Sequence, residues 1–154
     1  MIIIGSFFGF IISSLFSLIW ERRSGIIYDL KAIQYQLPYP FLKTFQIRSK
    51  ENWSDSVKLM VKGPLFVKPN ESIALVHFGT NFISEYKTLS KLFSNSLKSS
   101  EIILTDKLLE SINCTKILLI IAPGSITQDG LNLLNEELKM LNITVSGWIS
   151  IEPN

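Results

Sequence analysis

Few side chains in this chain could carry out catalysis or bind a metal ion. His77 is the only histidine and Cys114 the only cysteine among the 154 residues. Because protein metal sites use about three or four ligands, one histidine excludes a multi-histidine site, and a pair of Cys114 and His77 would lack further ligands. Glu136 and Glu137 are neighbours on an expected helix, where they point about 100° apart and form no carboxylate pair. The residue types therefore predict no catalytic residue and no metal site, and the expected role of His77 is packing.

The best candidates for contact with a ligand are loop residues that follow apolar runs. Open α/β sheets bind anions and other ligands at the carboxyl ends of their strands, where helices begin. Asp106 is also placed to cap the helix that follows it, which is the role we expect for it. Five residues in three such loops are weak ligand-loop candidates: Gly79, Thr80, Asp106, Gly124 and Ser125.

The loops are defined by a regular alternation of two patterns. Continuous apolar runs predict buried strands at 72–78, 101–105, 116–122 and 144–151. Helical spacing predicts helices at 83–97 and 106–112, and a third that is capped by Ser125 or Thr127 and ends at Leu141. The alternation predicts an α/β fold, a small, mostly parallel sheet of about four strands with flanking helices, Rossmann-like or P-loop-like.

The beginning of the chain predicts a single membrane-spanning helix. Residues 2–20 (IIIGSFFGFIISSLFSLIW) carry no charge, and as a helix they would extend roughly 28 Å, against a hydrocarbon core of about 30 Å. The alternative is a secretory signal peptide. We favour the span, because no positive residue precedes the apolar run and no A-x-A-like cleavage site follows it.

Small residues recur at every fourth position of this span and would lie on one helix face. Close backbone approach stabilises helix association in lipid, so the stripe predicts a partner transmembrane helix or a homo-oligomer. The alternative is that glycine and serine are simply common in membrane helices. The helix-packing candidates are Gly5, Gly9, Ser13 and Ser17, and the expected membrane-interface residues are Trp20, Arg22 and Arg23.

The charges predict an orientation and three segments. Residues 21–69 carry nine positive and four negative residues, whereas residues 70–154 carry six and nine. By the positive-inside rule the part after the span is cytoplasmic, with its basic stretch over the lipid headgroups. Four N-x-S/T sequons would argue for the opposite orientation if they were glycosylated, and we interpret them as chance. The expected segments are 1–20, the span; 21–69, a basic juxtamembrane helix and linker; and 70–154, a small cytoplasmic α/β domain.

Within the basic segment, residues 26–37 have the apolar spacing of an amphipathic helix that would lie on the membrane. Pro38 and Pro40 end it. Residues 41–52 look like a linker, and Ser54 is expected to cap a short helix that ends at Gly63.

The order of these parts resembles the polysaccharide chain-length determinant (polysaccharide co-polymerase) family, whose extended members continue into a bacterial tyrosine-kinase-like P-loop domain. The likeness covers a span with small residues at every fourth position, the following Glu21-Arg22, the Pro-punctuated LPYPFL (37–42) and the stretch 117–150 with Gly147 in its last strand. It implies the bacterial inner membrane, a role in capsule or lipopolysaccharide assembly, and partners in the polysaccharide polymerase machinery.

The chain departs from that family at the phosphate loop. A P-loop, G-x-x-x-x-G-K-[ST], uses backbone N–H groups and a lysine to neutralise phosphate. Here the loop is GTNFISEY (79–86), so that Ser84, Glu85 and Tyr86 stand at the Gly, Lys and Ser/Thr places, and a carboxylate at the lysine place would repel phosphate. No tyrosine follows Tyr86, although the kinases end in a tyrosine-rich tail. Kinase activity is therefore not expected.

The sequence predicts a non-enzymatic, membrane-anchored protein that acts by packing against an oligomer or a partner. No cofactor is expected, and a net charge of +2 without a basic stripe does not indicate a nucleic acid partner. Two alternatives stay open: a membrane-tethered nucleotide- or phosphate-binding domain with an atypical loop, and a truncated gene fragment.

Overall fold

A computed structural model describes residues 25–79 and 81–153, and all structural statements below concern that part of the chain. Among these residues, no helix combines the length and the apolar character that a membrane crossing requires. The residues predicted to form the span and its interface lie outside the described residues; they are Gly5, Gly9, Ser13, Ser17, Trp20, Arg22 and Arg23. The loop candidate Thr80 also lies outside them.

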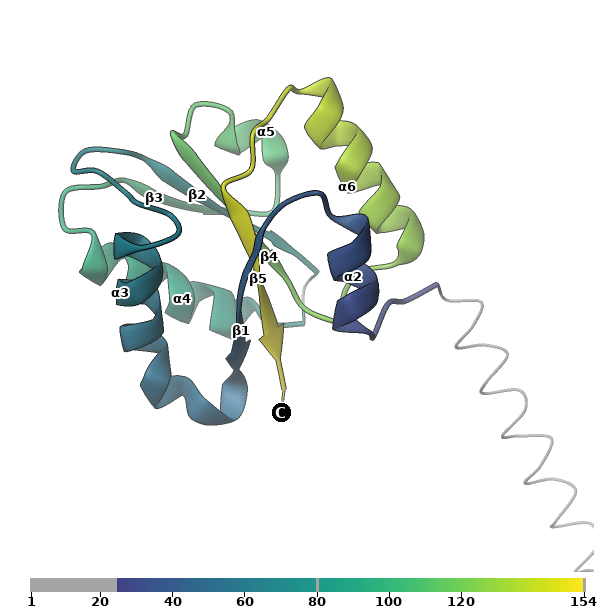
Figure 1. The fold of residues 1–154 in the computed structure, drawn as a ribbon, viewed down its shortest axis with the longest axis horizontal. Helices are drawn as coiled ribbons and strands as arrows, with labels where there is room; N and C mark the ends of the chain where they lie inside the picture. Colours follow the sequence, from purple (N-terminus) through teal and green to yellow (C-terminus); the bar gives the residue numbers. More distant parts are fainter. Residues whose placement is uncertain (1–24, 80, 154) are drawn as a thin grey trace, which may run out of the picture.

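The described residues form a parallel sheet with helices on both faces (Figure 1). The strand order is β1-β5-β4-β2-β3, and every pairing of neighbours is parallel. This confirms the α/β class, but the sheet has five strands in this part of the chain where about four were expected. The strands are β1 (Phe41–Gln46), β2 (Ile73–Phe78), β3 (Ile102–Thr105), β4 (Lys116–Ile121) and β5 (Gly147–Glu152).

The helices form two layers because alternate side chains of each buried strand point to opposite faces. One face packs against α3 (Trp53–Lys62) and α4 (Ile83–Ser96). The other packs against α2 (Leu30–Gln36), α5 (Leu108–Ser111) and α6 (Gln128–Met140). A 3-10 helix, η1 (Ile47–Asn52), joins β1 to α3.

The direction in which the chain crosses the sheet decides which face each helix covers. From β1 to β2 and then β3 it moves one way, with α3 and α4 on one face; from β3 back to β4 and β5 it moves the other way, with α5 and α6 on the opposite face. Right-handed crossovers require this change of face when the direction reverses. The chain therefore leaves the neighbouring strands β2 and β4 toward opposite faces, which places a topological switch point at their carboxyl ends.

The fifth strand corrects the linker expected at 41–52. β1 is an edge strand paired with β5, and Phe45 is buried in the core, where its ring meets that of Trp53 edge-on at 5.3 Å. An irregularity of register between Phe41 and Lys43 breaks the alternation that would have revealed the strand. Leu42 at this irregularity would lie 2.8 Å from a Cβ at Gly147, which explains a glycine in β5.

The amphipathic helix expected at 26–37 is also different. Only Leu30–Gln36 is helical, after Asp29, whose carboxylate accepts a hydrogen bond from the backbone N–H of Lys31. Ile33 and Leu37 are buried against the sheet. The apolar face of this helix therefore belongs to the core and is not left for a membrane surface.

The remaining elements lie at the expected places, although β5 begins at Gly147 rather than at residue 144, and α5 is shorter than the helix expected at 106–112. α3 ends at Lys62, with Gly63 at its C-cap as expected, but it begins at Trp53, with Asn52 rather than Ser54 at the N-cap position. Thr127 caps α6, since its hydroxyl accepts a hydrogen bond from the N–H of Gly130 at 3.0 Å. The short apolar runs of β2 and β4 are strands at almost the expected positions.

Phe45→Ala tests whether β1 is part of the core. We expect the free energy of unfolding to fall by about 3 kcal/mol or more, since the substitution removes a buried aromatic ring. Lys43→Ala, at an exposed position of the same strand, should change it by less than about 0.5 kcal/mol. Denaturant unfolding of the full chain in detergent measures both, and equal small effects would mean that β1 is a linker.

Candidate functional site

The loops after β2 and β4 meet at the switch point. Gly79 follows β2 with a φ of +89°, and a Cβ built on it would lie only 2.6 Å from the Cβ of Ser125, which follows β4. The Ser125 hydroxyl lies 2.6 Å from the carbonyl oxygen of Ala122 and 3.2 Å from that of Phe78, so it can donate to either. The structure therefore brings the candidates Gly79 and Ser125 together, and their contact closes the space between the loops.

Two aromatic side chains fill the layer beneath this contact. Tyr86 is fully buried, its ring stacks on that of His77 at 4.5 Å, and its hydroxyl donates to the carbonyl oxygen of Phe78 at 3.1 Å. Burial raises the pKa of Tyr86 to about 12, so the hydroxyl remains a protonated donor at neutral pH. The residue at the Ser/Thr place of a phosphate loop is thus a core side chain, and His77 packs against it.

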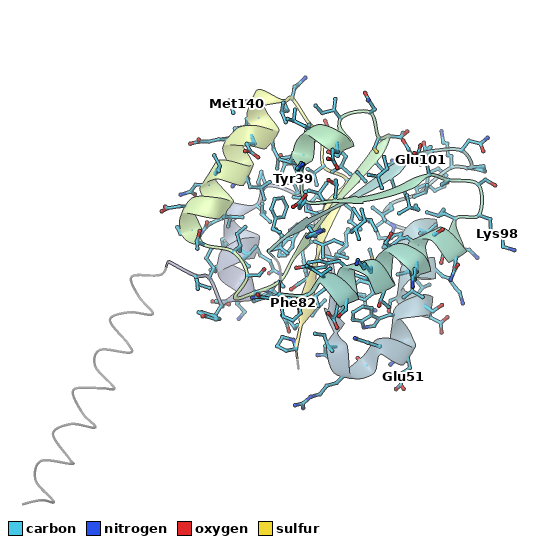
Figure 2. The ribbon with its side chains drawn as sticks, turned by 180° about the vertical axis from the view of Figure 1, so that it is seen from behind. Tyr39, Glu51, Phe82, Lys98, Glu101 and Met140 are labelled. Carbon is cyan, nitrogen blue, oxygen red and sulfur yellow. The ribbon has the colours of Figure 1, made fainter. Side chains whose placement is uncertain are left out.

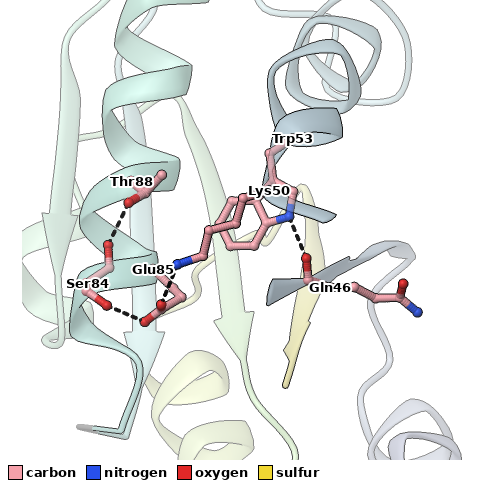
Figure 3. Close-up of polar contacts among 6 residues, drawn as sticks. All are labelled: Gln46, Lys50, Trp53, Ser84, Glu85 and Thr88. Atoms are coloured by element: carbon pink, nitrogen blue, oxygen red, sulfur yellow. Dashed lines mark hydrogen bonds and ion pairs between the residues drawn. The ribbon is translucent and has the colours of Figure 1, made fainter. Parts of the chain in front are cut away.

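Glu85, at the lysine place of that loop, is held in an ion pair (Figure 3). Its side chain is 12% exposed, and one carboxylate oxygen accepts from the Lys50 ammonium at 2.8 Å. The other oxygen accepts from the hydroxyl of Ser84. These two hydrogen bonds, with that from Lys50 the stronger, lower the pKa of Glu85, so it stays ionised and ties α4 to η1.

The same ion pair lies beside Trp53, whose side chain is held by a hydrogen bond. The Lys50 ammonium lies 5.9 Å from the ring centre of Trp53, and the indole N–H of Trp53 donates to the carbonyl oxygen of Gln46 at 2.9 Å (Figure 3). The turn from β1 into α3 is therefore fixed against α4. Sequence reasoning missed this contact, because Lys50 and Glu85 are 35 residues apart.

Two adjoining hollows open beside the closed loops. Gly79 and Ser125 line one of about 320 Å³ along α6, and Asp106 lines one of about 400 Å³ between α5 and α6. Phe78 and Glu137 border both hollows. The two carboxylates outnumber the one cation, Lys107, and the walls are largely apolar, so this surface disfavours a phosphate.

Asp106 does not have its expected role in these loops, and Gly124 has a partner that was not expected. Asp106 was expected to cap the next helix, but Thr105 holds that turn: its hydroxyl accepts from the N–H of Lys107 and donates to Glu110. Gly124, with a φ of +81°, donates its N–H to the carbonyl oxygen of Ile27 at 2.8 Å. The N–H of Gly124 is therefore paired with another part of the chain.

The partner of this loop is the short segment 25–28, which the sequence did not reveal. The N–H of Ile27 donates to the carbonyl oxygen of Ile126 at 3.0 Å, and the N–H of Gln128 to that of Gly25 at 2.8 Å. Ile26 and Thr127 form an antiparallel bridge. The first described residues are thus fixed to the loop between β4 and α6, at the carboxyl edge of the sheet.

The other chemically active groups are dispersed. Across residues 25–79 and 81–153, no three His, Cys, Asp or Glu side chains gather closely enough to hold a metal ion. Cys114 is half-buried, and burial raises the pKa of its thiol, which disfavours the nucleophilic thiolate.

Comparison with known proteins adds no relationship: no family model, curated protein or solved structure matches the chain significantly.

Glu85→Gln should lower the free energy of unfolding at neutral pH by about 1 kcal/mol, because it weakens the contact with half-exposed Lys50. A carboxylate with a lowered folded pKa stabilises above its ordinary pKa of about 4.3, and this contribution is lost as the pH falls through the folded value. The difference between variant and parent should therefore shrink on acidification. Urea unfolding across this pH range measures it, with Glu51→Gln on exposed η1 as the control; a difference independent of pH would contradict the ion pair.

Proposed function

We propose that this chain is a non-enzymatic, membrane-anchored protein of surface polysaccharide biosynthesis, similar in role to the chain-length determinants. One contrast carries the proposal. The chain begins with an apolar stretch long enough to span a bilayer, whereas its fold closes the switch point, where an α/β sheet would bind a nucleotide, with its own side chains.

The closed switch point supports a role without catalysis. A phosphoryl-transfer site needs backbone N–H groups open to the phosphates and a positive charge beside them. Here Gly79 and Ser125 are in contact, and the carboxylate of Glu85 is paired with Lys50. In the neighbouring hollows the carboxylates of Glu137 and Asp106 outnumber the one ammonium group, that of Lys107. The proposed action is therefore positional: the domain holds or spaces partners at the membrane.

The apolar stretch at the beginning of the chain supports the proposed anchor and its partners. Residues 2–20 are uncharged, Trp20, Arg22 and Arg23 suit the interface, and the excess of positive residues after the span favours a cytoplasmic domain in a bacterial inner membrane. The stripe of Gly5, Gly9, Ser13 and Ser17 offers a face for a second copy or for a helix of the polymerase machinery. The link to polysaccharide rests on the resemblance in the order of parts.

Ile11→Arg with Ile12→Arg tests the positional role. Each arginine at the centre of the span costs about 2.5–3.5 kcal/mol of insertion free energy, so the variant should leave the membrane fraction. In the source cells it should also lose any effect on the length distribution of surface polysaccharide, which gel electrophoresis measures. Ile11→Leu with Ile12→Leu is the matched control.

The proposal fails if the arginine variant leaves the membrane but keeps its full effect on chain length. It fails also if the full chain in detergent binds ATP saturably in the presence of magnesium, since that result would favour the nucleotide-binding alternative.

A further inference from the structure

We propose that the carboxyl edge of the sheet faces the headgroup layer of the membrane that carries the span. This edge comprises segment 25–28, the turn that begins α4 at Phe82 and Ile83, and loop 123–128 with the first turn of α6. The inference rests on the proposed function, because it takes residues 2–20 as the membrane anchor. Beyond that function, it specifies the side of the domain that contacts lipid.

The length of the connection limits how far this edge can lie from the lipid. Only five residue steps separate Trp20 from Gly25, and a fully extended chain covers at most about 18 Å in that number. Gly25 is itself hydrogen-bonded to Gln128, at the start of α6. The polar layer of a bilayer is about 5–7 Å deep on each side, so part of the connecting chain lies inside this layer. The carboxyl edge must therefore lie close to the headgroups.

The length of the strands keeps the amino edge of the sheet away from the headgroups. Each of the longer strands has six residues and thus spans about 20 Å. Figure 2 shows the separation, with Phe82 and Glu51 toward one end of the domain and Met140 and Glu101 toward the other. Lys62 ends α3 and Lys68 follows it toward the amino end of β2, so these members of the basic segment lie away from the tethered edge.

The side chains of the carboxyl edge suit an interface more than bulk water. Tyr28 is 59% exposed and lies over Gly124, and Ile83 is 44% exposed at the first turn of α4. A tyrosine ring has an apolar body and a polar tip, which favours the headgroup level. Where the carboxyl ends of the strands lead into η1 and α6 the charges have both signs, among them Arg48 and Asp129, so the contact should depend little on salt or on anionic lipid.

Fluorescence quenching in vesicles tests this orientation with the full chain. Four single-cysteine variants in a Cys114→Ser background place a dye at Ile83→Cys and Asp129→Cys on the carboxyl edge, and at Glu101→Cys and Met140→Cys toward the amino edge; all four positions are exposed. The chains are reconstituted into phosphatidylcholine vesicles that contain headgroup spin-labelled lipid. Quenching at Ile83→Cys and Asp129→Cys should be several-fold stronger than at the other two positions.

Flotation of the same vesicles separates the two possible failures. A chain that does not float with the vesicles overturns the anchor, and with it this inference. A chain that floats but is quenched equally at all four positions, or more strongly at Met140→Cys, keeps the anchor and overturns the orientation.

Discussion

The arrangement of the carboxyl edge depends on the backbone hydrogen bonds that join residues 25–27 to loop 124–128. They fix the beginning of the described chain to the carboxyl edge of the sheet, through Ile27 with Ile126 and Gly124, and through Gly25 with Gln128. The same loop holds Ser125 against the end of β2. One set of contacts therefore closes the switch point and sets where an N-terminal anchor must leave the domain.

The closed edge follows from how the two faces of the sheet are covered. Reversal of the crossover direction after β3 sends the chain to opposite faces after β2 and β4, which in an open sheet leaves a crevice between the loops. Here a glycine at 79 lets the loops touch, and Tyr86 and His77 fill the layer below. A position that the fold offers for ligand binding is used for packing, and the function we propose is accordingly one of placement.

The sequence predicted the parts whose signals are local. β2 and β4 are continuous apolar runs, and the Thr127 cap precedes a regular helical pattern, so each could be read within a short window. β1 and segment 25–28 could not, because their partners are β5 and loop 124–128, about a hundred residues along the chain. At the candidate site, loop position alone predicted Gly79 and Ser125. The ion pair of Lys50 and Glu85 needs the packing of α4 against α3, which no local pattern records.

Amide hydrogen exchange of the full chain in lipid or detergent tests the central claim most directly. The N–H groups of Ile27, Gly124 and Gln128 donate the hydrogen bonds between residues 25–27 and loop 124–128. Each should exchange far more slowly than an exposed amide, and the protection of Ile27 should approach that of the central strands. Exchange of all three at the rate of an unstructured peptide would contradict these hydrogen bonds, and with them the placement of the anchor at the carboxyl edge.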